Sequence, residues 1–340
     1  MGRLLTRRIV RSSLPVGRLA PSPTGDLHLG HARSFLLAWW SLRSRGGRVV
    51  LRIEDLDTAR TLPGAVDRIL ADLEWLGLDW DEGPLLQSTD PGPAQRALRQ
   101  LLDSGRAYAC TCSRREIESI QSAPHASDGT LRYPGTCRGR WASVEEAERA
   151  TGRPAGIRFL VPPGPVTWTD ALLGPRSLDV SEDAGDFLLA RRDGVLGYQL
   201  AVVVDDARVG INEVLRGDDL DPSTARQVLL QDALGLPHPT WVHVPLVLDE
   251  AGRRLAKRDA ARSLVSLREA GADPERIVHW AASSAGVPTR GPLPARSVLP
   301  LFPTARLTRR PTRLGAADLA SLFPGTPPAF RSFEEPASPP

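Results

Sequence analysis

Residues 16–31 read Val16-Gly17-Arg18-Leu19-Ala20-Pro21-Ser22-Pro23-Thr24-Gly25-Asp26-Leu27-His28-Leu29-Gly30-His31. The stretch predicts a strand, then a turn-rich loop over residues 21–25, then an apolar-periodic helix from Leu29 to about Arg43. The β-branched residues 48–53 predict a second strand, which ends at the acidic turn 54–57. A strand, a crossover helix and a strand form the unit of a parallel sheet, whose ligands bind at the carboxyl ends of the strands.

The predicted elements and the composition divide the chain into five segments. Residues 1–15 form a basic leader, 16–104 the first half of a doubly wound parallel α/β domain with further helices near 64–76 and 93–104, and 105–185 an insertion of short strands and turns. Residues 186–287 complete the sheet, with strands expected at 196–204, 211–215 and 242–248 and a helix at 223–234. Residues 288–340 hold 12 of the 31 prolines, which predicts a Pro- and Arg-rich tail.

Composition limits the class of protein. The 340 residues are 41% hydrophobic and 24% charged, which is typical of a globular chain of about two domains and excludes wholesale disorder. No apolar run approaches the ~18 residues of a membrane-spanning helix, and the arginine-bearing N-terminus lacks the apolar segment of a secretory signal. Three cysteines, an odd number, favour metal binding in a reducing compartment. We expect a cytoplasmic monomer that does not interact with membranes.

Lysine occurs once, at Lys257, among 43 basic residues. Arginine stands at every other basic position, so this position is where a compact, flexible ammonium is expected to be needed; chance retention of a surface lysine is the alternative. The surrounding segment, residues 252–259, predicts a cationic loop. Such an ammonium would stabilise the charge that develops on the β- and γ-phosphates when pyrophosphate leaves ATP.

His28, Gly30 and His31 open the first predicted helix directly after a loop. A helix N-terminus carries partial positive charge and suits phosphate oxygens, and a glycine permits close approach of an adenine or ribose. Two imidazoles three residues apart lie on one face of the first turn and can both reach a triphosphate. The alternative is a pair of ordinary surface histidines.

Cys110, Cys112 and Cys137 supply three soft ligands for tetrahedral Zn²⁺. Coordination chemistry alone would select His125 as the fourth ligand. Three buried free thiols are the alternative.

At this point the chain resembles the class I aminoacyl-tRNA synthetases, and specifically their glutamyl subgroup. Residues 18–31 look like the subgroup's N-terminal signature and residues 52–57 like its second motif. Residues 254–258, Arg-Leu-Ala-Lys-Arg, look like the KMSKS element in its KLSKR form, with arginine for the first lysine and Ala256 for the serine. The lost hydroxyl removes a phosphate hydrogen bond of about 0.5–1.5 kcal/mol, which predicts slower but not abolished activation.

The resemblance implies a Rossmann-type catalytic domain with an inserted, zinc-bearing subdomain that binds the RNA acceptor. It implies activation of L-glutamate by ATP with Mg²⁺ and transfer to tRNA. The implied catalytic residues are His28, His31 and Lys257, which with Gly30 also bind ATP. The implied glutamate-binding residues are Arg18, Leu19, Ala20, Pro21, Ser22, Glu54, Tyr198 and Arg216. Tyr198 could otherwise be a plain strand aromatic, and Arg216 a surface cation.

The resemblance also implies the zinc ligands, because the family pattern is Cys-x-Cys followed by Tyr-x-x-x-Cys. It adds Tyr133 to the three cysteines as the fourth ligand of a structural zinc ion and leaves His125 as the fallback. Only 81 residues follow Asp259. This length resembles the truncated glutamyl-queuosine tRNA(Asp) synthetase family, which esterifies the cyclopentenediol of queuosine in the anticodon of tRNA(Asp). The alternatives are a compact glutamate–tRNA ligase that charges the tRNA 3′ end and an inactive tRNA-binding paralogue.

Overall fold

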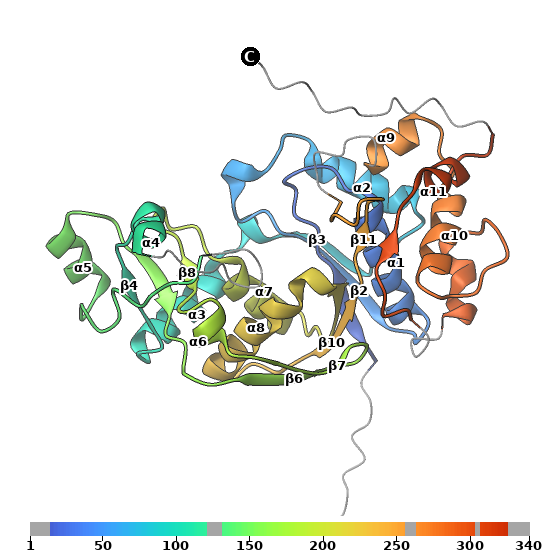
Figure 1. Cartoon of the computed structure of the whole chain (residues 1–340). Coiled ribbons are helices and arrows are strands. Elements are labelled where there is room, and N and C mark those ends of the chain that lie inside the picture. Colours follow the sequence, from blue (N-terminus) through green and yellow to red (C-terminus); the bar gives the residue numbers. More distant parts are fainter. Residues whose placement is uncertain (1–13, 121–130, 256–262, 303–306, 326–340) are drawn as a thin grey trace, which may run out of the picture.

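The computed structural model describes residues 14–120, 131–255, 263–302 and 307–325 (Figure 1). The predicted strand, helix and strand are present as β1 (Val16–Leu19), α1 (Leu29–Arg43) and β2 (Arg48–Ile53). β1 and β2 pair in parallel from Val16 opposite Arg48, and β3 (Glu82–Leu86) adds to the other edge of β2, also in parallel. The helices α2 (Ala65–Trp75) and α3 (Gly92–Asp103) lie where the sequence predicts them. The prediction of an α/β fold with parallel strands is confirmed.

A second sheet continues the first at β1. Its strands are ordered β7-β6-β10-β9, with β7 at Gly174–Leu178 and β6 at Val166–Asp170. In this sheet β9 (Glu213–Gly217) and β10 (Thr240–Val244) are parallel. The residue before β9 joins the two sheets, because the Asn212 amide donates to the Val16 carbonyl at 2.9 Å. The predicted helix near 223–234 is α8 (Asp221–Leu234). The carboxyl ends of β1, β2 and β9 therefore meet at one edge.

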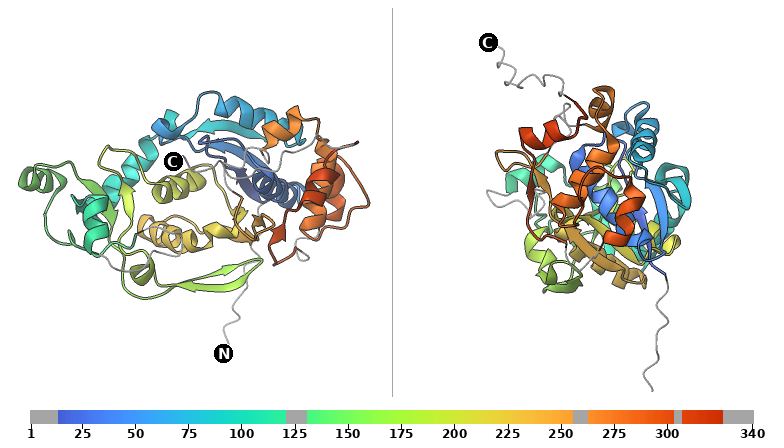
Figure 2. Two further views of the ribbon diagram at one scale, coloured as in Figure 1. Left: turned by 45° about the horizontal axis from the view of Figure 1, so that its top comes forward. Right: turned by 90° about the vertical axis from the view of Figure 1, so that its right-hand side faces the viewer.

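The inserted segment forms the lobe on the left of Figure 1 and of the left view in Figure 2. Its core is an antiparallel sheet of β4 (Ala107–Cys110), β5 (Gly156–Phe159) and β8 (Leu188–Ala190). The short helices α4 (Arg114–Ile120), α5 (Val144–Thr151) and α6 (Val180–Asp183) surround it. The hairpin of β6 (Val166–Asp170) and β7 (Gly174–Leu178) departs from this lobe, because β6 pairs with β10 of the main sheet.

One predicted strand is wrong. Residues 196–204 were expected to be a strand, whereas residues 198–208 form the helix α7 (Tyr198–Arg208). The run Leu200–Val203 is buried on every face, among residues of α3 and α8. A segment buried all round shows no helical period, so its β-branched valines imitate a buried strand.

The predicted tail is folded over most of its described length. After α9 (Leu264–Glu269) and α10 (Pro274–Ser284), a 3₁₀ helix, η5 (Ala295–Leu301), and the short helix α11 (Ala316–Ser321) pack on the main domain. β12 (Thr312–Arg313) pairs in parallel with β11 (Val247–Leu248). Phe302, Leu314 and Phe323 belong to the main core. Apolar residues spaced between prolines thus dock this segment without making an independent domain.

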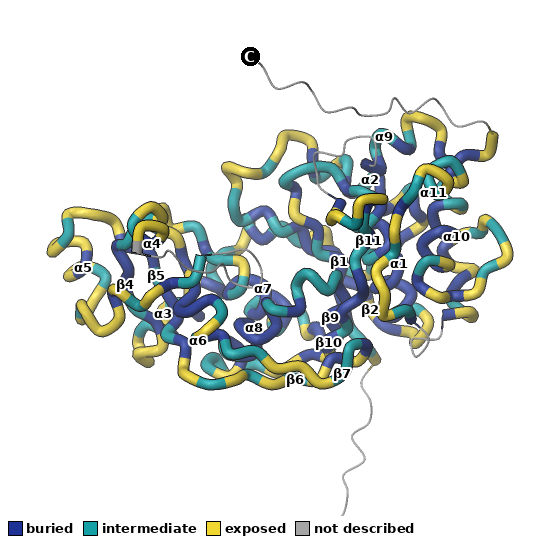
Figure 3. Tube along the Cα trace, in the orientation of Figure 1, coloured by how far each residue is buried: buried dark blue, intermediate teal, exposed yellow. Residues whose placement is uncertain are grey.

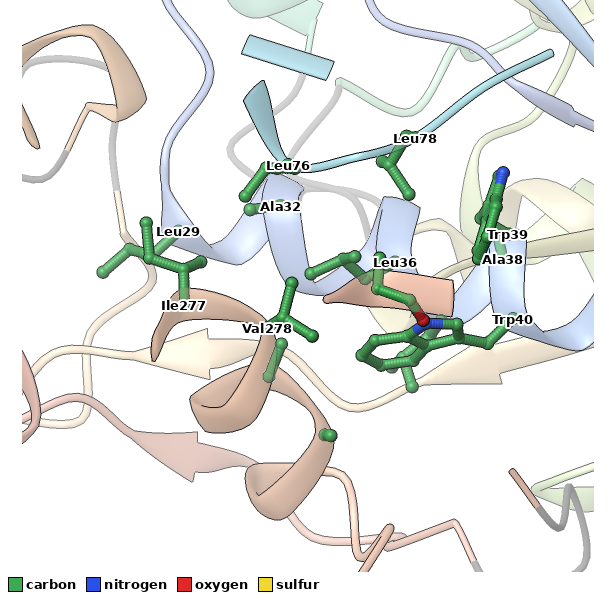
Figure 4. Packing of buried hydrophobic residues seen from close by; sticks show 14 of the residues in the cluster. Leu29, Ala32, Leu36, Ala38, Trp39, Trp40, Leu76, Leu78, Ile277 and Val278 are labelled. Carbon is green, nitrogen blue, oxygen red and sulfur yellow. The ribbon is translucent and has the colours of Figure 1, made fainter. Parts of the chain in front are cut away.

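The main core surrounds α1. Leu36, Trp39 and Trp40 of this helix are fully buried, and Ile277 and Val278 of α10 pack against it (Figure 4). Figure 3 shows burial concentrated in the sheet, α1 and α8, while α5 is mostly exposed. Within the described residues, no helix has the length and apolarity that crossing a bilayer requires.

Candidate active site

A cavity of about 490 Å³ lies at the carboxyl ends of β1, β2 and β9, beside the first turn of α1. Segments far apart in the chain line it. The predicted site residues among them are Arg18, Ala20, Pro21, Ser22, His28, Gly30, His31, Glu54, Tyr198 and Arg216. Tyr198 reaches the cavity from the first residue of α7, not from a strand. The structure therefore assembles into one cavity almost all the residues that the sequence analysis placed in a glutamate and ATP site.

Leu19 is the exception among the described residues. Its side chain is fully buried in the main core, and it does not line the cavity. Successive side chains of a strand point to opposite faces, so Arg18 faces the cavity and Leu19 faces α1 and the core. The side chain of Leu19 therefore lies in the core, and the predicted contribution of Leu19 to glutamate binding stays a prediction.

The flanks of the basic loop lie at the same cavity. Arg254 and Leu255 line it, and Arg254 forms an ion pair with Asp219. On the other side of the loop, the Leu264 amide donates to the Leu27 carbonyl at 2.7 Å, next to His28. Lys257 itself lies outside the described residues. One described flank of its loop thus lines the cavity, and the other contacts the residues at the start of α1.

The two histidines cap α1 reciprocally. His28 Nδ1 accepts from the amides of Gly30 and His31 at 3.1 and 3.3 Å, and His31 Nδ1 accepts from the His28 amide at 3.3 Å. The rings stack with centroids 3.7 Å apart. Because both Nδ1 atoms accept, a neutral ring carries its proton on Nε2. The helix start thus offers an anion imidazole N–H donors in addition to its partial positive charge.

Gly30 is required by this cap. A Cβ atom there would lie 3.0 Å from Cε1 and 3.1 Å from Nδ1 of His28. Close approach of a nucleotide is the role predicted for this glycine from the sequence. The structure adds a second reason for a glycine here, because the His28 ring occupies the space that a side chain would need.

A buried network of charges forms the floor of the cavity. Arg52 binds Asp206 through Nη1 and Oδ1 at 2.5 Å and Glu54 through Nη2 and Oε1 at 3.0 Å. Arg18 Nε lies 3.5 Å from the same oxygen of Asp206. Burial favours the neutral acid, but the charges of Arg52 and Arg18 outweigh it and hold the pKa of Asp206 below its usual range. Asp206 therefore stays ionised and fixes both arginines.

Glu54 is held differently. Burial raises its pKa above the usual range, although Arg52 and Arg18 oppose the shift. A substrate ammonium beside Glu54 would replace the missing hydration and favour the carboxylate. Among the charged residues that line the cavity, Glu54, Arg18 and Arg216 supply one acidic and two basic groups, which suit the ammonium and the two carboxylates of glutamate.

The three cysteines of the inserted lobe also meet. The Sγ atoms of Cys110, Cys112 and Cys137 all lie within 4.8 Å of one another. The Tyr133 hydroxyl lies 3.3 Å from the Cys110 sulfur and 3.7 Å from that of Cys112. Four tetrahedral ligands about 2.3 Å from a zinc ion stand roughly 3.7 Å apart, so the donor set fits such an ion. His125 lies outside the described residues.

The catalytic-domain model of the class I tRNA synthetases (E and Q) matches residues 16–287. The chain belongs to this synthetase family. It is therefore a ligase of the aminoacyl-tRNA synthetase type, and the α/β fold expected from that resemblance is confirmed.

Known class I synthetases resemble this one along most of the chain. A protein named glutamyl-Q tRNA(Asp) synthetase, from Symbiobacterium thermophilum, is 46% identical over 321 residues, which cover 91% of this chain and 99% of the relative. A glutamate–tRNA ligase of Synechococcus sp. (strain JA-2-3B'a(2-13)) is 42% identical over 81% of this chain and 57% of its own. The crystal structure of a glutamate–tRNA synthetase from Elizabethkingia anophelis superposes with a TM-score of 0.78 at 27% identity, covering 90% of this chain and 69% of that one. The resemblance to the glutamyl-Q tRNA(Asp) synthetase family is thus confirmed.

Sequence reasoning missed the residues of this synthetase that support the site from behind. Arg52 belongs to the second family motif but was not predicted as a site residue. Asp206, His243 and Asp170 were not predicted either. The one available signal was chemical, since charged residues directly after or within buried apolar runs require a partner.

Proposed function

We propose that this synthetase activates L-glutamate with ATP to glutamyl adenylate and transfers the glutamate to the cyclopentenediol of queuosine in the anticodon of tRNA(Asp). The observation that carries the activation step is the cavity, which joins the histidine-capped start of α1 to Arg18, Glu54, Tyr198 and Arg216. Such a site offers separate places for an amino acid and for the phosphates of a nucleotide.

The chain's own residues account for each step. Arg18 and Arg216 bind carboxylates and Glu54 the ammonium, which orients the α-carboxylate towards the α-phosphorus of ATP. As that carboxylate displaces pyrophosphate, imidazole N–H groups of His28 and His31 and the Lys257 ammonium stabilise the charge on the phosphates. When bound with ATP, Mg²⁺ would supply further positive charge at these phosphates. A hydroxyl of the acceptor then attacks the adenylate carbonyl, forming an ester and releasing AMP.

The acceptor is proposed from the relatives. One named glutamyl-Q tRNA(Asp) synthetase is 46% identical and is matched over 99% of its own length, whereas the glutamate–tRNA ligase of Synechococcus is 42% identical and is matched over 57% of its own length. This closer match supports queuosine over the tRNA 3′ end as the acceptor.

We also propose a structural zinc ion, held by Cys110, Cys112, Cys137 and Tyr133. Arg158 supports this donor set, because its Nε lies 3.3 Å from the Cys110 sulfur and its guanidinium lies 3.7 Å from the Tyr133 ring centroid. That positive charge offsets the excess negative charge of three thiolates around a divalent ion. The ion would hold the inserted lobe in shape.

Two assays test the proposal. Glutamate-dependent ATP–pyrophosphate exchange, measured without tRNA, should be positive. Its absence in a folded, zinc-loaded preparation would leave the compact glutamate–tRNA ligase, because glutamate–tRNA synthetases generally need tRNA for this step, or the inactive tRNA-binding paralogue. Labelled glutamate should then be transferred to tRNA(Asp) that contains queuosine, and not to unmodified tRNA(Asp) or tRNA(Glu). Transfer to tRNA(Glu) instead would favour the compact glutamate–tRNA ligase.

A further inference from the structure

A buried histidine lies behind Arg216. His243 of β10 is directly opposite Arg216 of β9 in the parallel pair, and both side chains are buried. The Arg216 Nε donates to His243 Nε2 at 3.0 Å. His243 does not line the cavity, so any effect on a substrate passes through Arg216.

The hydrogen bonds fix the tautomer of His243. A guanidinium nitrogen only donates, so His243 Nε2 accepts and the ring proton is on Nδ1. That Nδ1 lies 2.7 Å from Oδ2 of Asp170. Asp170 is itself held by the amides of Leu172 and Leu173, which donate to its Oδ1 at 2.9 and 2.7 Å. An imidazolium would place an N–H group against the Nε–H of Arg216.

The charged groups around the ring come from four elements. Asp170 lies on β6 and Arg216 on β9. Asp221 of α8 has its Oδ1 3.7 Å from His243 Nδ1 and forms an ion pair with Arg176 of β7. Burial lowers the pKa of His243, and the nearby charge of Arg216 lowers it further. The hydrogen bond to Asp170 opposes this shift but does not outweigh it. The ring therefore remains a neutral acceptor at neutral pH.

His243 helps to fix the orientation of the Arg216 guanidinium. The terminal nitrogens of the guanidinium bind other residues: Nη1 donates to Gln227 at 3.0 Å, and Nη2 to Thr224 and to the Leu220 carbonyl at 3.0 and 3.1 Å. These bonds act with the Nε bond to His243 to fix how the planar group turns about its aliphatic stem, and His243 holds the nitrogen attached to that stem. Among the described residues, one N–H of Nη1 is then left to face a ligand.

We propose that His243, oriented by Asp170, is a positioning residue that sets the plane of Arg216 for binding a carboxylate of glutamate. The inference rests on the proposed role of Arg216 in glutamate binding. It also gives the inserted segment a part in the glutamate site, because Asp170 belongs to the β6 strand that leaves the inserted lobe and pairs with β10.

Two amide side chains at position 243 separate the hydrogen bond to Arg216 from the hydrogen bond to Asp170. His243→Gln retains an oxygen near the place of Nε2 and can accept from Arg216, whereas His243→Asn retains a donor to Asp170 and loses the acceptor. In ATP–pyrophosphate exchange, His243→Asn should raise the KM for glutamate about tenfold to a hundredfold, the loss expected for a buried hydrogen bond to a charged group. His243→Gln should stay within a few fold of the parent, and both should keep the KM for ATP. Equal rises in the KM for glutamate in the two variants, or a larger rise in His243→Gln than in His243→Asn, would overturn the proposal.

A measurement on the unaltered chain is independent of activity and of the stability of the variants. In ¹⁵N NMR of histidine-labelled full-length protein, the His243 ring should show an unprotonated Nε2 and a protonated Nδ1 from pH 8 to pH 6, with the resonance assigned by its loss in His243→Gln. A protonated Nε2, or titration at the usual histidine pKa, contradicts the positioning role. Absence of glutamate-dependent exchange in the parent refutes the proposed function instead, and leaves the NMR result standing.

Discussion

Arg52 of β2 and Asp206 of α7 form a buried ion pair behind the cavity proposed to bind glutamate, with 2.5 Å between Nη1 and Oδ1. Asp206 serves Arg18 as well, so one carboxylate compensates two buried cations. The arrangement makes the site electrostatically dependent on a residue that does not line the cavity.

Asp206→Asn should therefore impair both stability and glutamate binding. Removing one partner of a buried pair costs about 3–5 kcal/mol, because an uncompensated charge remains. We expect a large loss in the free energy of unfolding measured in urea, and a rise of at least tenfold in the KM for glutamate. The matched control is Asp205→Asn, since Asp205 is equally buried but accepts from Gln87 at 2.7 Å. Similar behaviour of the two variants would show that Asp206 has no special role.

Gly30→Ala should reduce activation without unfolding the protein. The added Cβ would press on the His28 ring, 3.0 Å away, and displace it from the cap of α1. A lost N-cap costs about 1 kcal/mol, and alanine gains about as much in a helix, so the melting temperature should change little. We expect about a tenfold lower kcat/KM for ATP in the exchange assay. Gly291→Ala is the control, because nothing lies within 4 Å of its Cβ position. An unchanged Gly30→Ala enzyme would remove the steric reason for this glycine.

Asp72 predicts an unusual pH dependence of stability. It lies fully buried on α2, 3.2 Å from Arg268 of α9, and burial raises its pKa to about 6 despite that cation. Between pH 4 and 6 the unfolded chain has released this proton while the folded chain retains it. Stability therefore falls as pH rises through this window, by roughly 2–3 kcal/mol, and the loss persists above it.

Asp72→Asn should abolish that fall and be the more stable protein at pH 7, because the amide carries no buried charge and the partly exposed Arg268 can be hydrated. Urea unfolding at pH 4, 5, 6 and 7 measures both effects. Glu74→Gln, an exposed position on the same helix, is the control. A parent whose stability instead rises steadily from pH 4 to 6 while the Asn variant matches it would contradict this assignment.

The sequence predicted those parts of the site whose residues are close together in the chain. The histidine-capped start of α1 and the Cys-x-Cys pair are local patterns, and short loops hold their geometry. Arg216 and Glu54 were predicted through the family resemblance, and each directly follows a predicted strand. For the two local patterns, the residue type and its immediate neighbours carry the information.

The supporting residues could not be predicted in the same way. His243 meets Arg216 only because β10 pairs with β9, and Asp170 reaches His243 only because β6 leaves the inserted lobe to pair with β10. Strand pairing between distant segments leaves no period in the sequence. The helix α7 was missed for a related reason, since Leu200–Val203 is buried on every face and the helical pattern is erased.

Zinc removal should affect the inserted lobe before the main domain. Cys112→Ser removes a thiolate that lies 3.4 Å from the Cys137 sulfur, and should lower the zinc content well below one ion per chain. Tyr133→Phe should weaken zinc binding at least tenfold, whereas His125→Ala should retain it. Zinc content by elemental analysis after dialysis against a chelator distinguishes them. Loss of zinc in His125→Ala with retention of zinc in Tyr133→Phe would identify His125, and not Tyr133, as the fourth ligand.

Lys257→Ala should lose most of the activation step. The described flanks of its loop, Leu255 and Leu264, lie at the cavity and beside His28, which supports the proposed action of the Lys257 ammonium on the phosphates. Removing one group that stabilises developing charge typically costs about a hundredfold to a thousandfold in kcat. The matched control is Arg253→Ala on the same loop, since Arg253 is largely exposed and already pairs with Asp249 at 2.9 Å.

The exchange assay should show the loss of kcat in Lys257→Ala with little change in the KM for glutamate, because the ammonium acts on the phosphates and not on the amino acid. Lys257→Arg should recover only part of the rate, since a planar guanidinium cannot replace a compact ammonium at a single phosphate oxygen. Exchange rates equal to the parent's in Lys257→Ala would assign the charge stabilisation to the arginines of the loop. Lys257 would then be a lysine retained by chance in a chain whose other basic residues are arginines.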